Sequence, residues 1–163
     1  MQAMFRPLVL QVADNPAVEQ FFHTNRATRS LVERFVAGET LDLAIGQART
    51  IARQGMGTTL DLLGENVTSE KEAREAIGRY ITILRRMSES GLDPNISVKL
   101  TMLGLDIAES LAVEGMREIL AFTRNVGGFV RVDMEGSAYT EQTIQIVDGL
   151  HREFPDEVGT VIQ

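Results

Sequence analysis

The chain has 163 residues, of which 44% are hydrophobic and 24% charged, a balance typical of a globular domain and not of a disordered chain. Its net charge of −7 argues against nucleic-acid binding, because neutralising phosphates needs a basic face. The sequence has no cysteine and 2 histidines, which excludes disulfides, thiolate nucleophiles, cysteine-ligated metals and a multi-histidine metal site.

The first part of the chain has the periodicity of helices. Three helices are predicted, one opening at Asn15 and the others over 28–35 and 40–54, with apolar residues at three- or four-residue spacing. The short apolar stretch at the start is interrupted by proline and glutamine and is well below the ~20 residues of a membrane span, so neither a signal peptide nor a transmembrane helix is expected. We predict that residues 1–55 form a helical segment ahead of a second region, 56–163.

From residue 56 onward, strand-like and helical stretches alternate. The strand-like runs are rich in Val, Ile and Leu, and the helical stretches carry an apolar stripe, formed in the last helix by Ile144, Val147 and Leu150. This alternation predicts an α/β fold with parallel strands covered by helices. The strands are predicted at 57–63, 95–100, 129–134 and 158–163, and the helices from the capping box at Ser69 to before Gly91, over 107–123 and over 139–154.

The spacing of these units separates two α/β architectures only in part. Units of roughly 30–38 residues fit a (β/α)₈ barrel, whose ~250 residues divide into eight such units. A doubly wound sheet alternates in the same way, but the first strand–helix turn lacks the Gly-x-Gly-x-x-Gly pattern of dinucleotide-binding sheets. The fourth strand ends the sequence with no helix to cover it, and four strands cannot close a barrel. We therefore expect the first half of a barrel, with the rest missing from this sequence or supplied by another chain.

Reactive groups in such folds lie at the carboxyl ends of the strands. Lys99 lies near the end of an apolar strand and needs a polar cavity, solvent or a partner, because burying an unpaired ammonium is costly. It could bind a substrate carboxylate, form a Schiff base, or simply pair with a neighbouring carboxylate. Asp133 ends the next buried run on the same side as Arg131. It could take part in the chemistry, or pair with Arg131 or Lys99.

The same rule selects further residues, among them Glu135 at the end of the third predicted strand. The carboxamide of Gln163 could bond a ring edge or a ribose, or be an ordinary polar group at a strand end. Met134 is expected to pack by its side chain while its backbone lies beside the site. Asp61 and Glu65 could do acid–base work as a carboxylate pair, or serve as a turn cap and a helix-start charge.

Four segments, in order and with matching gaps, resemble the strand motifs of bacterial proline dehydrogenases. They are 60–65 (LDLLGE), 96–106 (ISVKLTMLGLD), 130–135 (VRVDME) and 159–163 (GTVIQ). The resemblance runs from about residue 15 to the end. It implies a distorted (β/α)₈ barrel preceded by helices, which binds FAD without a covalent link and oxidises L-proline to Δ1-pyrroline-5-carboxylate. It further implies a quinone as electron acceptor, and a cytoplasmic protein with peripheral contact at the inner membrane.

The resemblance also implies roles for four residues. Lys99 is similar to the lysine that pairs with the proline carboxylate, and Asp133 to the aspartate that orders the active site. Met134 matches the position whose backbone meets the flavin, and Gln163 the amide that bonds the flavin ring system. Members of the family continue through further strands that bring more flavin- and proline-binding cations. The 163 residues alone are therefore expected to lack a complete flavin site and to be inactive.

Two other functions remain open at this point. Lys99 could be the Schiff-base lysine of an aldolase or lyase barrel. Alternatively, the chain could be a non-catalytic half-barrel whose exposed sheet edges bind a partner or a second copy. The sequence leaves the oligomeric state and the identity of the quinone undetermined.

Overall fold

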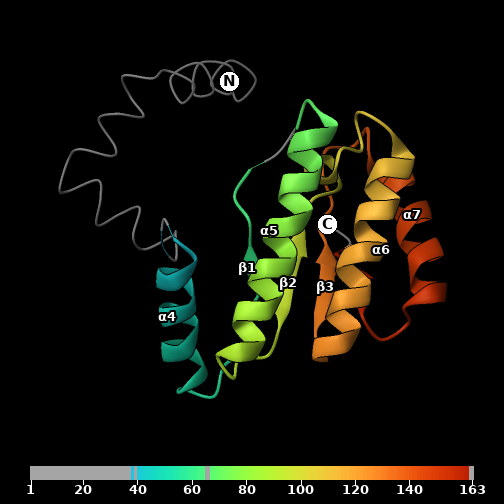
Figure 1. The fold of residues 1–163 in the computed structure, drawn as a ribbon. Coiled ribbons are helices and arrows are strands. Elements are labelled where there is room, and N and C mark those ends of the chain that lie inside the picture. The colour runs from blue at the N-terminus through green and yellow to red at the C-terminus, as the bar shows by residue number, and fades with distance from the viewer. Residues whose placement is uncertain (1–37, 39, 65–66, 162–163) are drawn as a thin grey trace, which may run out of the picture. The chain divides into compact units, whose positions relative to one another are not determined.

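The computed structural model describes residues 38, 40–64 and 67–161, so the first two predicted helices lie outside the described residues. Ile45–Gln163 form one compact unit, to which the description below refers. The predicted boundary near residue 55 stays a prediction. In chain order (Figure 1) the described elements are α4 (Leu41–Ala52), β1 (Leu60–Asp61), α5 (Glu70–Glu89), β2 (Asn95–Val98), the 3₁₀ helix η1 (Leu100–Leu103), α6 (Glu109–Val126), β3 (Phe129–Val132), α7 (Thr140–Glu153) and β4 (Val158–Thr160).

The strands form one parallel sheet in the order β1-β2-β3-β4. In its register Ile96 lies opposite Leu60 and Val130, and Val130 lies opposite Val158. A doubly wound sheet reverses its strand order part-way, whereas this order follows the chain, so every crossover steps in the same direction. Figure 1 shows α5 and α6 together on one side of the sheet. The arrangement is the α/β fold of a (β/α)₈ barrel, as predicted, seen here as an arc of four strands.

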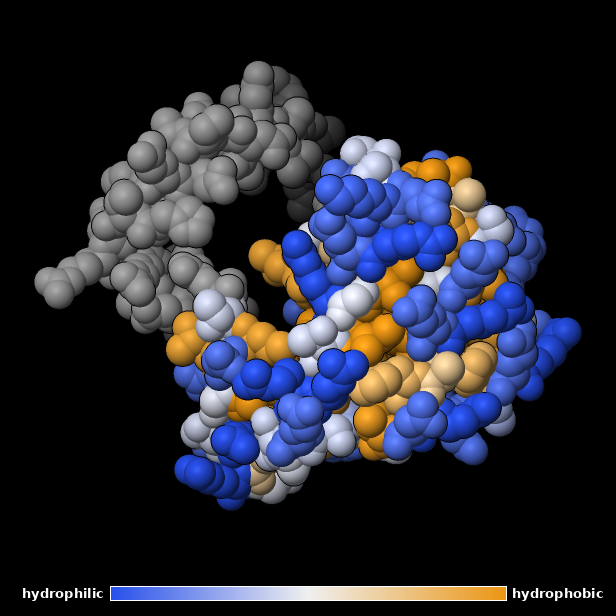
Figure 2. Space-filling view, viewed as in Figure 1, coloured by the Kyte–Doolittle hydropathy of each residue, from blue (hydrophilic) through white to orange (hydrophobic). Residues whose placement is uncertain are grey.

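The core lies between the sheet and these helices. Ile96 and Val98 of β2 and Val130 and Val132 of β3 are all 0% exposed. They occupy alternate positions, so they point to the same face of the sheet. Figure 2 shows apolar side chains between α5 and α6, with polar side chains on the outer surfaces of the helices. The helix-facing side of the sheet is therefore dry and apolar.

A capping box fixes the start of α5. The Ser69 hydroxyl accepts a hydrogen bond from the Glu72 backbone N–H (3.3 Å), and the Glu72 carboxylate accepts one from the Ser69 N–H (3.2 Å). The Thr68 N–H also donates to Glu72 (2.8 Å), and this bond is the main cause of the lowered pKa of the Glu72 carboxyl. The sequence prediction of this cap is confirmed.

A glycine allows α5 and α6 to approach each other closely. A Cβ atom added at Gly115 of α6 would lie 2.6 Å from Cδ1 of Ile77 in α5. Both residues are buried, so the contact has no room for an extra methyl group. By contrast, a Cβ at Gly78 of α5 would meet nothing within 4 Å. The interhelical contact therefore depends on the missing side chain at Gly115.

Three sequence predictions need correction. The strands are shorter than predicted: β1 covers two residues of the predicted 57–63, and β2 ends at Val98 because Leu100 turns into η1. Since β3 ends at Val132, Asp133 and Met134 follow that strand. Ile144, predicted to face the core, is 48% exposed. The buried stripe of α7 instead runs through Thr143, Ile146, Val147 and Leu150, a spacing that leaves Ile144 off the stripe.

Candidate functional site

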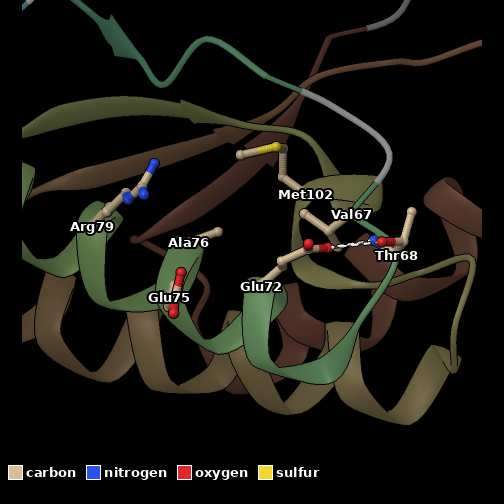
Figure 3. A pocket seen from close by; sticks show the side chains of 7 residues that line it. All are labelled: Val67, Thr68, Glu72, Glu75, Ala76, Arg79 and Met102. Carbon is tan, nitrogen blue, oxygen red and sulfur yellow. Dashed lines mark hydrogen bonds between the residues drawn. The ribbon is translucent and has the colours of Figure 1, made fainter.

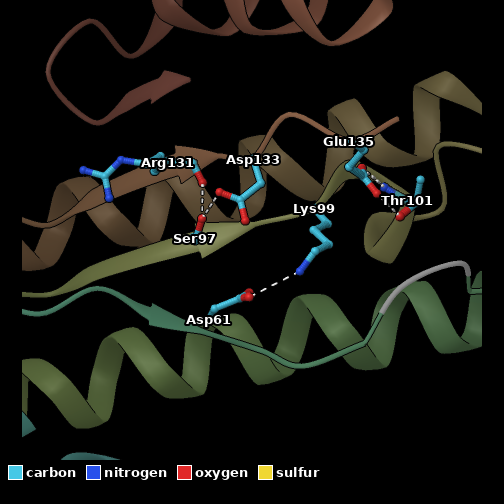
Figure 4. Close-up of polar contacts among 7 residues, drawn as sticks. All are labelled: Asp61, Ser97, Lys99, Thr101, Arg131, Asp133 and Glu135. Carbon is cyan, nitrogen blue, oxygen red and sulfur yellow. Dashed lines mark hydrogen bonds and ion pairs between the residues drawn. The ribbon is translucent and has the colours of Figure 1, made fainter. Parts of the chain in front are cut away.

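The face of the sheet opposite the helices is polar. Because side chains alternate along a strand, Ser97 and Lys99 point away from the core that Ile96 and Val98 fill. Asp61 lies opposite Ser97 in the register of β1 with β2. The backbone N–H of Asp133 donates to the Val98 carbonyl (2.9 Å), which extends the pairing of β2 with β3 by one step. In Figure 4 Asp61, Lys99 and Asp133 lie on three neighbouring chain segments, with the Lys99 amine directed toward Asp61 and the Asp133 carboxylate toward Ser97. We call these three residues the strand-end site.

Lys99 forms an ion pair across the sheet with Asp61. Its Nζ lies 3.3 Å from Asp61 Oδ2, and the two side chains are 23% and 37% exposed. The pairing of Lys99 with a neighbouring carboxylate, one of the alternatives from the sequence, is therefore observed. An ammonium has three donors, so this bond leaves Lys99 able to bind a second anion. The lysine is half-buried but accessible.

Asp133 is held by a hydroxyl group and not by a cation. The Ser97 hydroxyl donates a short hydrogen bond to Asp133 Oδ1. Arg131 instead donates to the Thr59 hydroxyl (3.1 Å), and Figure 4 shows its guanidinium directed away from Asp133. Pairing of Asp133 with Arg131 or Lys99, the alternatives from the sequence, is therefore wrong. The sequence reasoning missed Ser97, whose place two residues before Lys99 was the available signal.

A second hydroxyl–carboxylate contact lies beyond Lys99. The backbone N–H of Thr101 donates to Glu135 Oε2 (3.1 Å), and its hydroxyl donates to Oε1 (2.5 Å). Thr101 is 1% exposed, so without Glu135 both donors would be buried without partners. We call this contact the Thr101–Glu135 clasp. It ties the turn after β2 to the loop after β3. The sequence placed Glu135 at a strand end but gave no sign of Thr101.

Of the two residues expected to contact a flavin, the structure describes Met134 but not Gln163. Met134 is half-buried beside Asp133, and within the described part of the chain its backbone makes no hydrogen bond to another backbone group. Gln163 and Glu65 lie outside the described residues. The predicted roles of Met134 and Gln163 stay predictions.

A buried tyrosine lies beneath the strand-end site. Tyr80 of α5 is 0% exposed, and the backbone of Lys99 is the polar group that acts on its hydroxyl, although their geometry falls short of a regular hydrogen bond. Burial raises the pKa of this hydroxyl well above its usual range, and the negative charge of Asp61 adds to the effect. Tyr80 therefore stays neutral and brings no charge to the site.

The pocket in Figure 3 is separate from these residues. It has a volume of about 350 Å³ and lies at the start of α5, next to η1. None of the residues of the strand-end site lines it. Within the described ranges, no group of histidine, aspartate and glutamate side chains is arranged to hold a metal ion, and no helix is long and apolar enough to cross a bilayer. The residues that line the pocket are Val67, Thr68, Glu72, Glu75, Ala76, Arg79 and Met102.

Comparison with known proteins finds relatives of one kind, the proline dehydrogenases. A model of the proline dehydrogenase family matches residues 44–163. The chain is 36% identical over 160 residues to Proline dehydrogenase 1 of Bacillus subtilis subsp. natto. The aligned region covers 98% of this chain and 52% of that protein. It is 35% identical over 164 residues to Proline dehydrogenase of Deinococcus radiodurans, with the same coverage of both chains. The chain thus spans about half the length of these relatives.

Solved structures support the fold. The described arrangement is similar to proline utilization A (PutA) from Bdellovibrio bacteriovorus, with a TM-score of 0.74 and 24% identity over 83% of this chain and 17% of that one. PutA from Bradyrhizobium japonicum gives a TM-score of 0.63 at 19% identity, over 91% of this chain and 16% of that one. At these identities the likeness bears on the fold alone.

Proposed function

Because the chain belongs to the proline dehydrogenase family, we propose that it supplies substrate-binding strands to the FAD-dependent oxidation of L-proline to Δ1-pyrroline-5-carboxylate. The family match supports the reaction class. The observation that carries the assignment to this site is the position of Lys99, an accessible cation at the end of β2 on the polar face of the sheet. The residues beside it then take roles that follow from their charges.

Lys99 binds the carboxylate of proline in this proposal. A charge-assisted hydrogen bond to a carboxylate is stronger than a neutral one and distinguishes an amino acid from a simple cyclic amine. Asp61, 3.3 Å from the Lys99 amine, keeps the side chain on this face of the sheet when no substrate is bound. Loss of a hydride from the ring carbon puts positive charge on the ring nitrogen. The carboxylate of Asp133 on the same face favours that charge.

The residues after β3 suit an FAD ring system. A flavin ring edge carries hydrogen-bond donors and acceptors, and the backbone of Met134, next to Asp133, carries one group of each kind. Met134 would hold the cofactor through these groups, and Gln163 through its carboxamide. FAD, when bound, supplies the acceptor for the hydride that leaves proline. The part of the chain described here has to hold the proline ring in position for that transfer.

The electron acceptor and the location complete the proposal. We expect a quinone to take up the electrons, and a cytoplasmic protein that touches the inner membrane peripherally. An aldolase function receives less support, because a Schiff base starts from a neutral amine while Lys99 forms an ion pair with Asp61. Borohydride treatment in the presence of substrate should therefore leave no covalent adduct on Lys99.

The test of the proposed function is the variant Lys99→Met in a flavin-loaded protein with the complete barrel, because the 163 residues alone are expected to lack a complete flavin site. The parent should reduce its flavin on addition of L-proline. In the variant, proline binding should weaken by about 10- to 150-fold, which corresponds to the loss of one charge-assisted contact. Flavin content, read from the absorbance spectrum, should remain unchanged. Proline binding as tight as in the parent would show that Lys99 does not hold the carboxylate.

Two controls isolate the carboxylate contact. Pyrrolidine has the ring and nitrogen of proline without the carboxylate, so its binding should be equal in the parent and in Lys99→Met. Lys71, the other lysine of the chain, is 86% exposed on α5, and Lys71→Met should leave proline binding unchanged. A parent protein that binds flavin but is not reduced by proline would overturn the reaction itself.

A further inference from the structure

The carboxylates of the polar face are held by hydroxyl groups on both sides of Lys99. Ser97, Lys99 and Thr101 occupy alternate positions along β2 and the turn that follows it. The Ser97 hydroxyl binds Asp133, and the Thr101 hydroxyl and backbone N–H bind Glu135. Lys99 lies between these two contacts. In Figure 4 its amine points away from both carboxylates and toward Asp61.

Glu135 would otherwise compete for the lysine. It is a carboxylate with a long side chain, and its partner Thr101 is only two residues from Lys99. Both of its oxygens are used by Thr101, through the backbone N–H and the hydroxyl. A carboxylate whose oxygens already accept strong hydrogen bonds gains less from an additional ammonium. The clasp therefore reduces the attraction between Glu135 and Lys99.

The clasp also fixes the turn that follows the lysine. The Lys99 carbonyl accepts a hydrogen bond from the Met102 N–H (3.1 Å), which begins η1. All four residues of η1 are buried. Thr101 is the polar member of this buried turn, and Glu135 satisfies its two donors. Glu135, in the loop after β3, thus helps to fix the position of the Lys99 backbone.

We propose that Thr101 and Glu135 are positioning residues, whose clasp keeps Glu135 off the Lys99 amine and leaves that amine available to a ligand carboxylate. The clasp is formed by residues of this chain and needs no ligand. Its use for proline rests on the proposed function. The two can be tested separately, because the chemical reactivity of Lys99 can be measured without substrate.

The test uses the small number of lysines. Lys71 and Lys99 are the two lysines of the chain, so acetylation by acetic anhydride can be followed at each by peptide mass spectrometry. Thr101→Val removes the hydroxyl and leaves Glu135 Oε1 facing a methyl group, so this oxygen becomes free to approach the Lys99 ammonium, two residues away along the chain. Acetylation of Lys99 should slow by about two- to five-fold, the range expected for one new partly exposed ion pair. Lys71 should react at the parent rate and serves as the internal reference.

Three further variants decide the cause. Thr101→Ser keeps the hydroxyl and should restore the parent rate. The double variant Thr101→Val with Glu135→Gln removes the competing charge and should also restore it. Thr123→Val removes another buried threonine hydroxyl, one that bonds the Ile119 carbonyl (2.8 Å) within α6, and should leave the Lys99 rate unchanged. Circular dichroism verifies that each variant is folded, and Thr101→Ala replaces Thr101→Val if the latter is not.

The outcomes separate the clasp from the proposed function. Unchanged or faster acetylation of Lys99 in Thr101→Val would overturn the proposal, since faster reaction means that the turn has merely loosened. Slower acetylation that the double variant restores supports it. If proline binding follows the same order across the variants, the clasp serves the proposed function. If acetylation follows this order and proline binding does not, the clasp stands and the proposed function fails.

Discussion

The two faces of the same sheet differ completely in chemistry. Toward the helices, Ile96 and Val98 of β2 are fully buried among apolar neighbours. On the opposite face, Ser97 of β2 and Lys99 directly after it meet the carboxylates of Asp133, after β3, and Asp61, in β1. The change from one face to the other occurs between adjacent residues. β2 and the residue after it thus place buried apolar side chains at even positions and polar side chains at odd positions.

The two faces differ in how a polar side chain can be accommodated on them. On the helix-facing side, which we call the dry face, a polar atom would lose its hydrating water without compensation, whereas the polar face, which we call the open face, is reached by solvent. On the open face, Asp61, Asp133 and Glu135 each have a specific partner, yet remain partly accessible. A ligand can therefore exchange for one of these contacts without disturbing the core. A change on the polar face should therefore leave the core intact, and we call this the separation of the two faces.

The largest effect on stability should come from adding a lysine on the buried, helix-facing side of the sheet. Val98→Lys places an ammonium where the parent side chain is 0% exposed. An unpaired buried charge should cost on the order of 5 kcal/mol, close to the whole stability of a small domain. We expect loss of the folded state by circular dichroism and urea denaturation. Lys99→Val, the matched change on the open face, should alter stability by no more than about 1 kcal/mol. Equal effects would refute the separation.

Truncation of neighbouring side chains should give a smaller difference of the same sign. Ile96→Ala leaves a cavity in the dry face and should cost about 2–5 kcal/mol. Ser97→Ala removes the hydroxyl that binds Asp133 and should cost about 1 kcal/mol. Urea denaturation of both variants measures the difference. A larger loss for Ser97→Ala would mean that the polar face is the main source of stability.

The close contact of α5 with α6 tests whether the dry side is tightly packed. Gly115→Ala would place a methyl group 2.6 Å from Cδ1 of Ile77, and this steric cost of about 1–3 kcal/mol should exceed the gain in helix propensity of about 0.5–1 kcal/mol, so we expect a net destabilisation of up to about 2 kcal/mol. Gly78→Ala, also in a helix but with free space around it, should stabilise the fold by about 0.5–1 kcal/mol. Thermal unfolding of the pair should therefore move in opposite directions. A stabilising Gly115→Ala would show a loosely packed interface.

The smallest effect concerns the pH dependence of stability, which we expect to arise in part from Glu72 at the exposed start of α5. The hydrogen bonds from Thr68 and Ser69 lower the pKa of the Glu72 carboxyl in the folded state. Glu72 therefore stabilises the fold above its unfolded pKa of about 4.3, and this contribution is lost as the pH falls through the lowered value. Glu72→Gln should be less stable than the parent at neutral pH. The difference should vanish in acid, and a constant difference from neutral to acidic pH would contradict this.

Local patterns predicted much of this fold, whereas contacts between strands were harder to foresee. The capping box at Ser69 was predicted correctly because both of its partners lie within four residues. The Lys99–Asp61 pair was foreseen only as a pairing with some neighbouring carboxylate, because the partner depends on the register between β1 and β2. Ser97 and Thr101 were missed for the same reason. Ile144 was misplaced because a small error in helix phase rotates the apolar stripe.

The alternation along β2 has a consequence for how the chain can change over time. Exchanges at Ser97 or Lys99 can alter which molecules are bound while the interior stays intact. Insertion or deletion of one residue ahead of Lys99 inverts both sides at once, bringing its ammonium inward and exposing a valine. New specificities in this lineage should therefore arise by point substitution within the strands, and length variation should be confined to the connecting loops.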